Sequence, residues 1–255
     1  MGEDQVLEAY EAFAPIYNEF NHLNDYEMWL GRVLLPELEK HGLRHGRVLD
    51  VACGTGRAFA PLLRRGWQIT GCDLSPAMLE RAKSEADDQV ELAQADMREL
   101  PVFGEFELII SLNDPVNYLF GDEDLERALD GMRANLADNG LLLFDSNAIS
   151  TFKSVYSTEV REVEFGGRRW TWRAVGEVGD SPITFENVIE GDDVEPIRHR
   201  ERFWAEPEVR AAMKSAGLDC LATLGMWESD GQVLLSDSPD ESRHYKIIYI
   251  GAKAG

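Results

Sequence analysis

The sequence has few of the features that mark secreted, membrane-bound or metal-rich proteins. No apolar run approaches the roughly 20 residues that a membrane span needs, and residues 1–14 are acidic and amphipathic, unlike a secretory signal. The three cysteines, Cys53, Cys72 and Cys220, form no CxxC pair and no repeated metal-ligand spacing. Because a sparse, odd cysteine count is typical of a reducing compartment, we expect a cytoplasmic protein with no membrane partner and no metal.

Positive charge is also scarce. The 255 residues include 25 Lys and Arg against 47 Asp and Glu, which gives a formal net charge of −22. The short basic pieces, such as Arg64-Arg65 and Arg168-Arg169, are interrupted by acidic or apolar residues. A long basic stripe, which would release counterions from a phosphate backbone, is missing, so we expect no nucleic-acid partner.

Short apolar strands alternate with helical patterns through the middle of the chain. Strands are expected at 47–51, 68–72, 90–93, 106–112 and 141–145, and the helix after the fourth strand at 122–137. This order predicts a doubly wound, mostly parallel α/β sheet, which binds ligands at the carboxyl ends of its strands.

Segments with other patterns flank and interrupt this core. Residues 1–44, with amphipathic helices expected at 3–14 and 25–40, are interpreted as a helical lid. Residues 152–205 turn to alternating polar and apolar residues, and Gly166-Gly167 signals a hairpin. We therefore expect an antiparallel insert over the ligand edge. The core then consists of 45–151 and 206–255, where a helix at 207–216 and strands at 218–226 and 245–250 complete a seven-stranded sheet.

A glycine loop, Val-Leu-Asp-Val-Ala-Cys-Gly-Thr-Gly, spans the first strand and the turn after it at 48–56. Glycine has no side chain to block a close approach between the backbone and a ligand. The dinucleotide fingerprint requires Gly-x-Gly-x-x-Gly, but Gly54 begins Gly-Thr-Gly-Arg-Ala-Phe. The missing third glycine argues against a pyrophosphate ligand.

Acidic residues follow the next two strands. Asp73 lies 19 residues after Gly54, where a carboxylate can accept hydrogen bonds from both hydroxyls of a ribose. Ser75 and Pro76 already supply the cap and first position of the next helix, which leaves Asp73 free for a ligand. Asp96 and Met97 offer a carboxylate for an exocyclic amine and a polarizable side chain for an aromatic base. Together these residues predict a nucleoside-shaped site.

This combination resembles the class I S-adenosylmethionine-dependent methyltransferases, which have a Rossmann-like fold. The likeness spans residues 45–148 and rests on the glycine loop, on Cys-Asp-Leu-Ser-Pro-Ala-Met-Leu at 72–79 and on Gln-Ala-Asp-Met-Arg at 94–98. It implies that S-adenosyl-L-methionine is the cofactor, with Ala52 and Gly54 at its methionine end, Asp73 at the ribose, and Asp96 and Met97 at the adenine. The further cofactor-binding residues that the resemblance implies are Tyr17, Asp50, Cys53, Leu74, Met78, Ser111 and Leu112.

The loop Asn-Asp-Pro-Val-Asn-Tyr at 113–118 follows the fourth strand and should face the methyl group. Methyltransferases that modify nucleic-acid amines have Asn/Asp-Pro-Pro-aromatic here, and this loop lacks the second proline and the adjacent aromatic. It is more similar to small-molecule enzymes, including the N,N-dimethyltransferases of antibiotic amino sugars. Tyr118 stands where those enzymes have a substrate-orienting histidine. We expect a small-molecule acceptor, with Asp114, Tyr118 and His199 as candidate catalytic residues.

The sequence leaves several alternatives open. An amine acceptor needs little acid–base assistance, whereas a hydroxyl acceptor needs a base, for which His22 and His199 are candidates. An amine N-methyltransferase is our main prediction, and a small-molecule O-methyltransferase is the alternative. A nicotinamide oxidoreductase would lack its third glycine, and a cofactor-binding protein without catalysis would share the same loop. The acceptor and the oligomeric state, a homodimer included, stay open.

Overall fold

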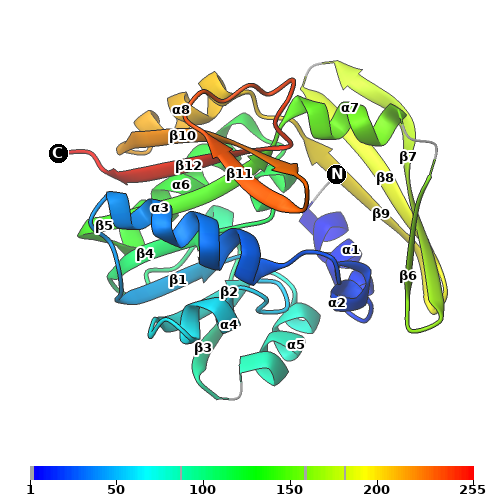
Figure 1. Ribbon diagram of the computed structural model, residues 1–255, viewed down its shortest axis with the longest axis horizontal. Coiled ribbons are helices and arrows are strands. Elements are labelled where there is room, and N and C mark those ends of the chain that lie inside the picture. The colour runs from blue at the N-terminus through cyan, green and yellow to red at the C-terminus, as the bar shows by residue number, and fades with distance from the viewer. Residues whose placement is uncertain (1–2, 87, 158–159, 181) are drawn as a thin grey trace.

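The computed structural model describes residues 3–86, 88–157, 160–180 and 182–255. The main sheet (Figure 1) has eight strands, which from one edge to the other are β11 (Gln232–Ser236), β10 (Leu218–Ser229), β12 (Lys246–Lys253), β5 (Leu136–Asn147), β4 (Phe106–Ser111), β1 (Arg47–Val51), β2 (Gln68–Asp73) and β3 (Val90–Gln94). The five strands from β5 to β3 in this order pair in parallel, whereas β12, β10 and β11 are antiparallel to their neighbours.

Helices cover both faces of the main sheet, because successive residues of a strand point to opposite faces. In β4, Leu108 and Ile110 pack on one face and Ile109 on the other. The first face is covered by η1 (Glu27–Leu34), α3 (Leu35–Lys40), α4 (Phe59–Leu63) and α5 (Pro76–Ala86), and the second by α6 (Asp122–Asn135) and α8 (Glu206–Ser215). The doubly wound α/β fold predicted from the sequence is confirmed.

A second, antiparallel sheet lies beside the main one. Its strands are β6 (Arg161–Phe165), β7 (Arg168–Asp180), β8 (Ile183–Gly191) and β9 (Val194–Arg202). The glycine hairpin joins β6 to β7, with both glycines at positive φ. Figure 1 shows α1 (Glu3–Phe13) and α2 (Tyr17–Phe20) between the two sheets. Phe13, Ile16 and Phe20 pack there against Trp170 and Ile197 of the antiparallel sheet.

Three short helices complete the described chain: η2 (Met97–Glu99), η3 (Pro115–Tyr118) and α7 (Ile149–Ser157). Both η2 and η3 follow parallel strands and so lie at the edge where ligands are expected. No helix among the described residues is long and apolar enough to cross a membrane.

The structure adds an eighth strand to the seven that the sequence predicts. Ser229 of β10 pairs with Gln232 of β11, so Asp230 and Gly231 form a two-residue hairpin loop. Their φ angles of 52° and 72° are those of a type I′ turn, for which Asp-Gly is a strong signal. The helix expected at 25–40 also differs, because its first half, η1, is wound as a π-helix.

Candidate active site

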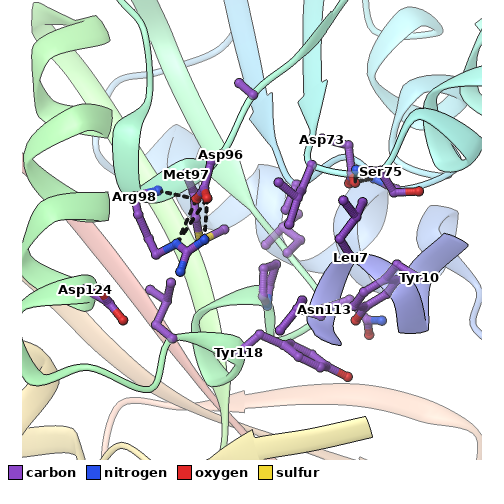
Figure 2. Close-up of a pocket in the computed structure, with 18 of the residues that line it drawn as sticks. Leu7, Tyr10, Asp73, Ser75, Asp96, Met97, Arg98, Asn113, Tyr118 and Asp124 are labelled. Atoms are coloured by element: carbon purple, nitrogen blue, oxygen red, sulfur yellow. Dashed lines mark hydrogen bonds and ion pairs between the residues drawn. The ribbon is translucent and has the colours of Figure 1, made fainter. Parts of the chain in front are cut away.

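A pocket opens at the carboxyl ends of β1, β2, β3 and β4, with about 990 Å³ of space including its mouth. Figure 2 shows Asp73 and Asp96 on opposite sides of it, and Tyr10 and Tyr118 together at one end. Its wall is formed by Val6, Leu7, Tyr10, Tyr17, Ala52, Gly54, Asp73, Leu74, Ser75, Ala95, Asp96, Met97, Arg98, Leu112, Asn113, Pro115, Tyr118, Leu119, Phe120 and Asp124. The pocket thus lies where doubly wound sheets bind ligands.

The glycine loop forms one wall of this pocket. Ala52 and Gly54 have left-handed backbone angles, with φ of 60° and 55°. A side chain placed on Gly54 would meet no protein atom within 4 Å, since that space belongs to the pocket. The loop therefore exposes its backbone to whatever occupies the pocket, as the sequence predicts.

Asp73 ends β2 with its side chain nearly buried. One carboxylate oxygen accepts a hydrogen bond from the Gly54 amide at 2.8 Å, and the other from the Ser75 amide at 2.9 Å. Ser75 Oγ accepts from the Met78 amide and so caps α5, which confirms the predicted cap. Leu74 also contributes a backbone hydrogen bond to Asp73. A carboxylate has about four acceptor sites, so Asp73 retains acceptor capacity on the pocket side, as a ribose hydroxyl requires.

Asp96 and Met97 also line the pocket, but the Asp96 carboxylate already has a partner. Arg98 donates to both of its oxygens through the guanidinium, and to one of them through its backbone amide at 2.9 Å. Burial raises the pKa of Asp96, but the hydrogen bonds and charge of Arg98 outweigh it and the net pKa is lowered. An adenine amine would share this carboxylate with Arg98, which the sequence prediction did not include.

A narrower recess extends behind the glycine loop. Asp50, Cys53, Tyr17, Tyr26 and Arg57 line it, together with Ala52, Gly54, Thr55, Ala58 and Leu112. Burial and the charge of Asp73 raise the pKa of Asp50 well above its ordinary value. The Arg57 guanidinium donates to the backbone oxygens of Asn21 and Asn24. Carboxylate and guanidinium in one recess suit the amino and carboxylate groups at the methionine end of S-adenosylmethionine.

Two residues predicted to bind the cofactor lie off the pocket walls. Met78 is fully buried against Phe13 and Trp170, because α5 turns its side chain toward the N-terminal helices. Ser111 is fully buried at the end of β4, and Leu112 lines the pocket instead. The other predicted cofactor residues line the pocket or its recess.

A second pocket adjoins the first between the N-terminal helices, the main sheet and the antiparallel sheet. Four residues border both pockets, namely Tyr10, Tyr17, Asn113 and Tyr118. The second pocket is also lined by Phe13, Phe20, Asn21, Asn24, Asp114, Asn147, Thr151, Phe152, Arg161, Trp172, Phe185, Glu186, Asn187, Ile189, His199 and Glu201. The predicted catalytic residues Asp114, Tyr118 and His199 therefore lie together around one cavity.

The loop between the pockets has a strained backbone that a buried ion-pair network holds in place. Asn113 and Asp114 have φ of 72° and 63°, and their amides donate to the Asp145 carboxylate at 2.6 and 3.0 Å. Lys246 Nζ lies 2.5 Å from Asp114 and 2.6 Å from Asp145. Burial lowers the pKa of Lys246, but the two carboxylates outweigh it and raise the net pKa. Asp114 is thus already paired, which limits the role of proton acceptor predicted for it.

His199 is buried beside the tyrosines. Its Nδ1 lies 3.3 Å from the Tyr118 hydroxyl, and the Tyr10 ring meets it edge-on at 5.4 Å. Burial lowers the pKa of His199 to about 4, so the imidazole is neutral at pH 7. The other candidate base, His22, is exposed and binds the Glu19 carbonyl, away from both pockets.

The sequence analysis missed the most unusual acid of the second pocket, Glu201. It accepts hydrogen bonds from Asn147 at 3.0 Å and Asn187 at 3.4 Å. Burial, followed by the charge of Asp114, raises the pKa of Glu201 to about 8. A signal was available: Ile197, His199 and Glu201 alternate along β9 and share one face, so a buried His199 implies a buried Glu201.

Comparisons with known proteins identify the family of this chain. Residues 48–140 match the family model described as "Methyltransferase domain". A putative methyltransferase of Geobacillus sp. (strain WCH70) is 31% identical over 205 residues, which cover 76% of this chain and 80% of that protein.

Solved structures share the whole fold. An S-adenosylmethionine-dependent methyltransferase from Clostridium acetobutylicum ATCC 824 aligns with a TM-score of 0.76 at 22% identity, covering 96% of this chain and 99% of the other. The sugar N-methyltransferase KedS8 from Streptoalloteichus sp ATCC 53650 aligns with a TM-score of 0.69 at 20% identity, covering 94% and 93%. The chain therefore belongs to the S-adenosylmethionine-dependent methyltransferases, and the pocket around Gly54 and Asp73 fits their cofactor.

Proposed function

We propose that this enzyme methylates an amine nitrogen of a small molecule. The proposal is supported by the pKa values and the ion pairing of the side chains where the two pockets meet. A hydroxyl acceptor needs a base whose pKa lies near the working pH. Where the pockets meet, His199 contacts Tyr118 and has a pKa of about 4, and Asp114 is paired with Lys246. Glu201 has a suitable pKa of about 8, but it lines only the second pocket, where Asn147 and Asn187 bind its carboxyl group. Burial also raises the pKa of Tyr118 well above its ordinary value.

A neutral amine does not need such a base, since its nitrogen already carries a lone pair. S-adenosylmethionine supplies an activated methyl group, so the residues of this chain have to align the acceptor and exclude water. The Tyr118 hydroxyl can orient the nitrogen, with His199 Nδ1 holding that hydroxyl. Tyr10 and Tyr17 border both pockets and cover the meeting point from the N-terminal helices.

The shape and chemistry of the second pocket support a small acceptor. It is enclosed by aromatic side chains, among them Phe13, Phe152, Trp172 and Phe185, and aromatic faces attract cations electrostatically. The fold is shared with the sugar N-methyltransferase KedS8, which methylates nitrogen, as proposed here. The net charge of −22 further supports a small molecule over a nucleic acid.

The test is release of S-adenosylhomocysteine from S-adenosylmethionine in the presence of paired acceptors. Each pair consists of a primary amine and the alcohol of the same skeleton, drawn from arylalkylamines, amino acids and amino sugars. We expect product with amines and background levels with the matched alcohols. Turnover with alcohols alone would refute amine chemistry, and cofactor binding with no turnover on any pair would favour a protein that binds the cofactor without catalysis.

A further inference from the structure

A cluster of ionisable groups at the second pocket contains more acids than bases. Asp114, Asp145 and Glu201 provide three carboxyl groups, and Lys246 provides one ammonium. Lys246 is bound by Asp114 and Asp145. Glu201 has no ion-pair partner among the residues that the structure describes. Because a buried charge without a partner is costly, ionisation of Glu201 would require one more positive charge in this cluster.

Hydrogen-bond acceptors also outnumber donors at Glu201. Its two neighbours, Asn147 and Asn187, each donate through the side-chain amide. The Asn187 side-chain oxygen is buried and has no hydrogen-bond partner among the described residues. An ammonium group carries three donors and no acceptor, so it would satisfy both the charge and the unpartnered oxygen.

The other charged residues of this pocket do not supply the missing cation. Arg161 is exposed on β6, and its guanidinium lies over the Trp172 ring, 5.9 Å from the ring centroid. Glu186 of β8 is only partly buried and faces Arg200, with 3.6 Å between Nε and the carboxylate. Glu201 is therefore the acid in this pocket whose counter-ion is missing.

We propose that the methyl acceptor binds as a cation, with its ammonium group held by Glu201 and the Asn187 side-chain oxygen. This inference rests on the proposed amine methylation and narrows it to amines that are protonated at neutral pH. Before methyl transfer, an N–H bond of the ammonium breaks and the proton passes to a Glu201 oxygen. The electron pair stays on nitrogen, which becomes the nucleophile, and Glu201 becomes a neutral acid.

Binding of such an acceptor has a proton signature. With its pKa of about 8, Glu201 is mostly protonated in the free enzyme at pH 7. An ammonium group stabilises the ionised form, so its binding should release roughly one proton to solvent. A neutral alcohol of the same shape should release none. This proton release does not depend on catalysis, because it should also occur when S-adenosylhomocysteine, which has no methyl group to transfer, occupies the first pocket.

The experiment is calorimetric titration of the enzyme saturated with S-adenosylhomocysteine. Phenethylamine and 2-phenylethanol serve as the probes, and each is measured at pH 7 in two buffers with different ionisation enthalpies to count protons. We expect the amine to bind at least tenfold tighter than the alcohol and to release close to one proton. Equal affinities, or tight amine binding without proton release, would overturn the assignment of Glu201.

Two Glu→Gln variants, which make the same change of charge, test whether the proton release and the preference for the amine come from Glu201. Glu201→Gln should remove the proton release and most of the preference for the amine, while S-adenosylhomocysteine affinity stays unchanged and shows that the fold is intact. Glu195→Gln makes the same change of charge at an exposed position of β9 outside both pockets, and it should retain both properties. Proton release that persists in Glu201→Gln contradicts the proposal. If Glu201→Gln does not fold, the affinities and proton release that wild type shows with phenethylamine and 2-phenylethanol still test the proposal.

The outcomes separate this inference from the proposed function. Methylation of amines by wild type and Glu201→Gln with the same KM would leave amine methylation standing and refute the role of Glu201. Amine binding with proton release, but no methyl transfer to any amine, would support the Glu201 site and refute amine methylation.

Discussion

Replacement of Asp73 by asparagine probes the cofactor pocket with the smallest change of shape. Both carboxylate oxygens accept a backbone N–H, one from Gly54 at 2.8 Å and one from Ser75 at 2.9 Å. In Asp73→Asn, an NH2 group must replace one oxygen. It then faces one of these N–H groups, which loses its acceptor, and it can no longer accept a hydrogen bond from the adjacent ribose hydroxyl. A hydrogen bond to a charged group is worth about 1.5–3 kcal/mol, which corresponds to a roughly 10- to 150-fold loss of affinity.

The assay is equilibrium dialysis or calorimetry with S-adenosylmethionine, together with a thermal melt. A suitable control is Glu91→Gln, which makes the same charge change at an exposed position on the neighbouring strand β3. We expect the control to bind like wild type. If folded Asp73→Asn binds the cofactor with wild-type affinity, Asp73 does not hold the ribose and the orientation inferred for the ligand is wrong.

Three further variants test the region between the pockets. Lys246→Met leaves the Asp114 and Asp145 carboxylates without their buried counter-ion, which should cost about 3–5 kcal/mol in denaturant unfolding. Adding Asp114→Asn removes one of the two unpaired carboxylates and should recover part of that loss, because Asp145 still accepts its two backbone amides. An unaltered midpoint in Lys246→Met would contradict the ion pairs. His199 has a folded pKa of about 4, below its unfolded value of ~6.5, so stability is lost as pH falls through this window. The His199 share is about 2 kcal/mol between pH 7 and pH 5, and His199→Phe should lack it; identical pH profiles would disprove a buried neutral imidazole. Tyr118→Phe should lower kcat with little change in cofactor affinity, and the opposite pattern would move Tyr118 into the cofactor site.

The cofactor half of the site could be predicted from the sequence because its geometry is local. The predicted residues Gly54, Asp73 and Met97 lie at the end of a parallel strand or within three residues after it. Strand ends meet at one edge by topology alone. The ion pair between Arg98 and Asp96 could not be predicted in this way, because the order of strands does not show which side chains contact each other after a strand ends.

The acceptor half could not be predicted in the same way, because tertiary packing creates its chemistry. Glu201 is one of 47 acidic residues, and it becomes unusual only when β9 pairs with β8 and faces Asn147 of β5. Lys246 gains its role through Asp114, which lies 132 residues away in sequence. The missed strand β11 is different in kind, since Asp230-Gly231 carried a local turn signal that was available.

The proposed amine methylation requires the second pocket to present an amine nitrogen to the methyl group of S-adenosylmethionine. The most direct measurement is transfer of an isotope-labelled methyl group to acceptors that carry a primary amine and a hydroxyl in one molecule, such as tyramine and glucosamine. The labelled position in the product is then read by NMR. We expect the label on nitrogen, and label on oxygen alone would refute amine methylation.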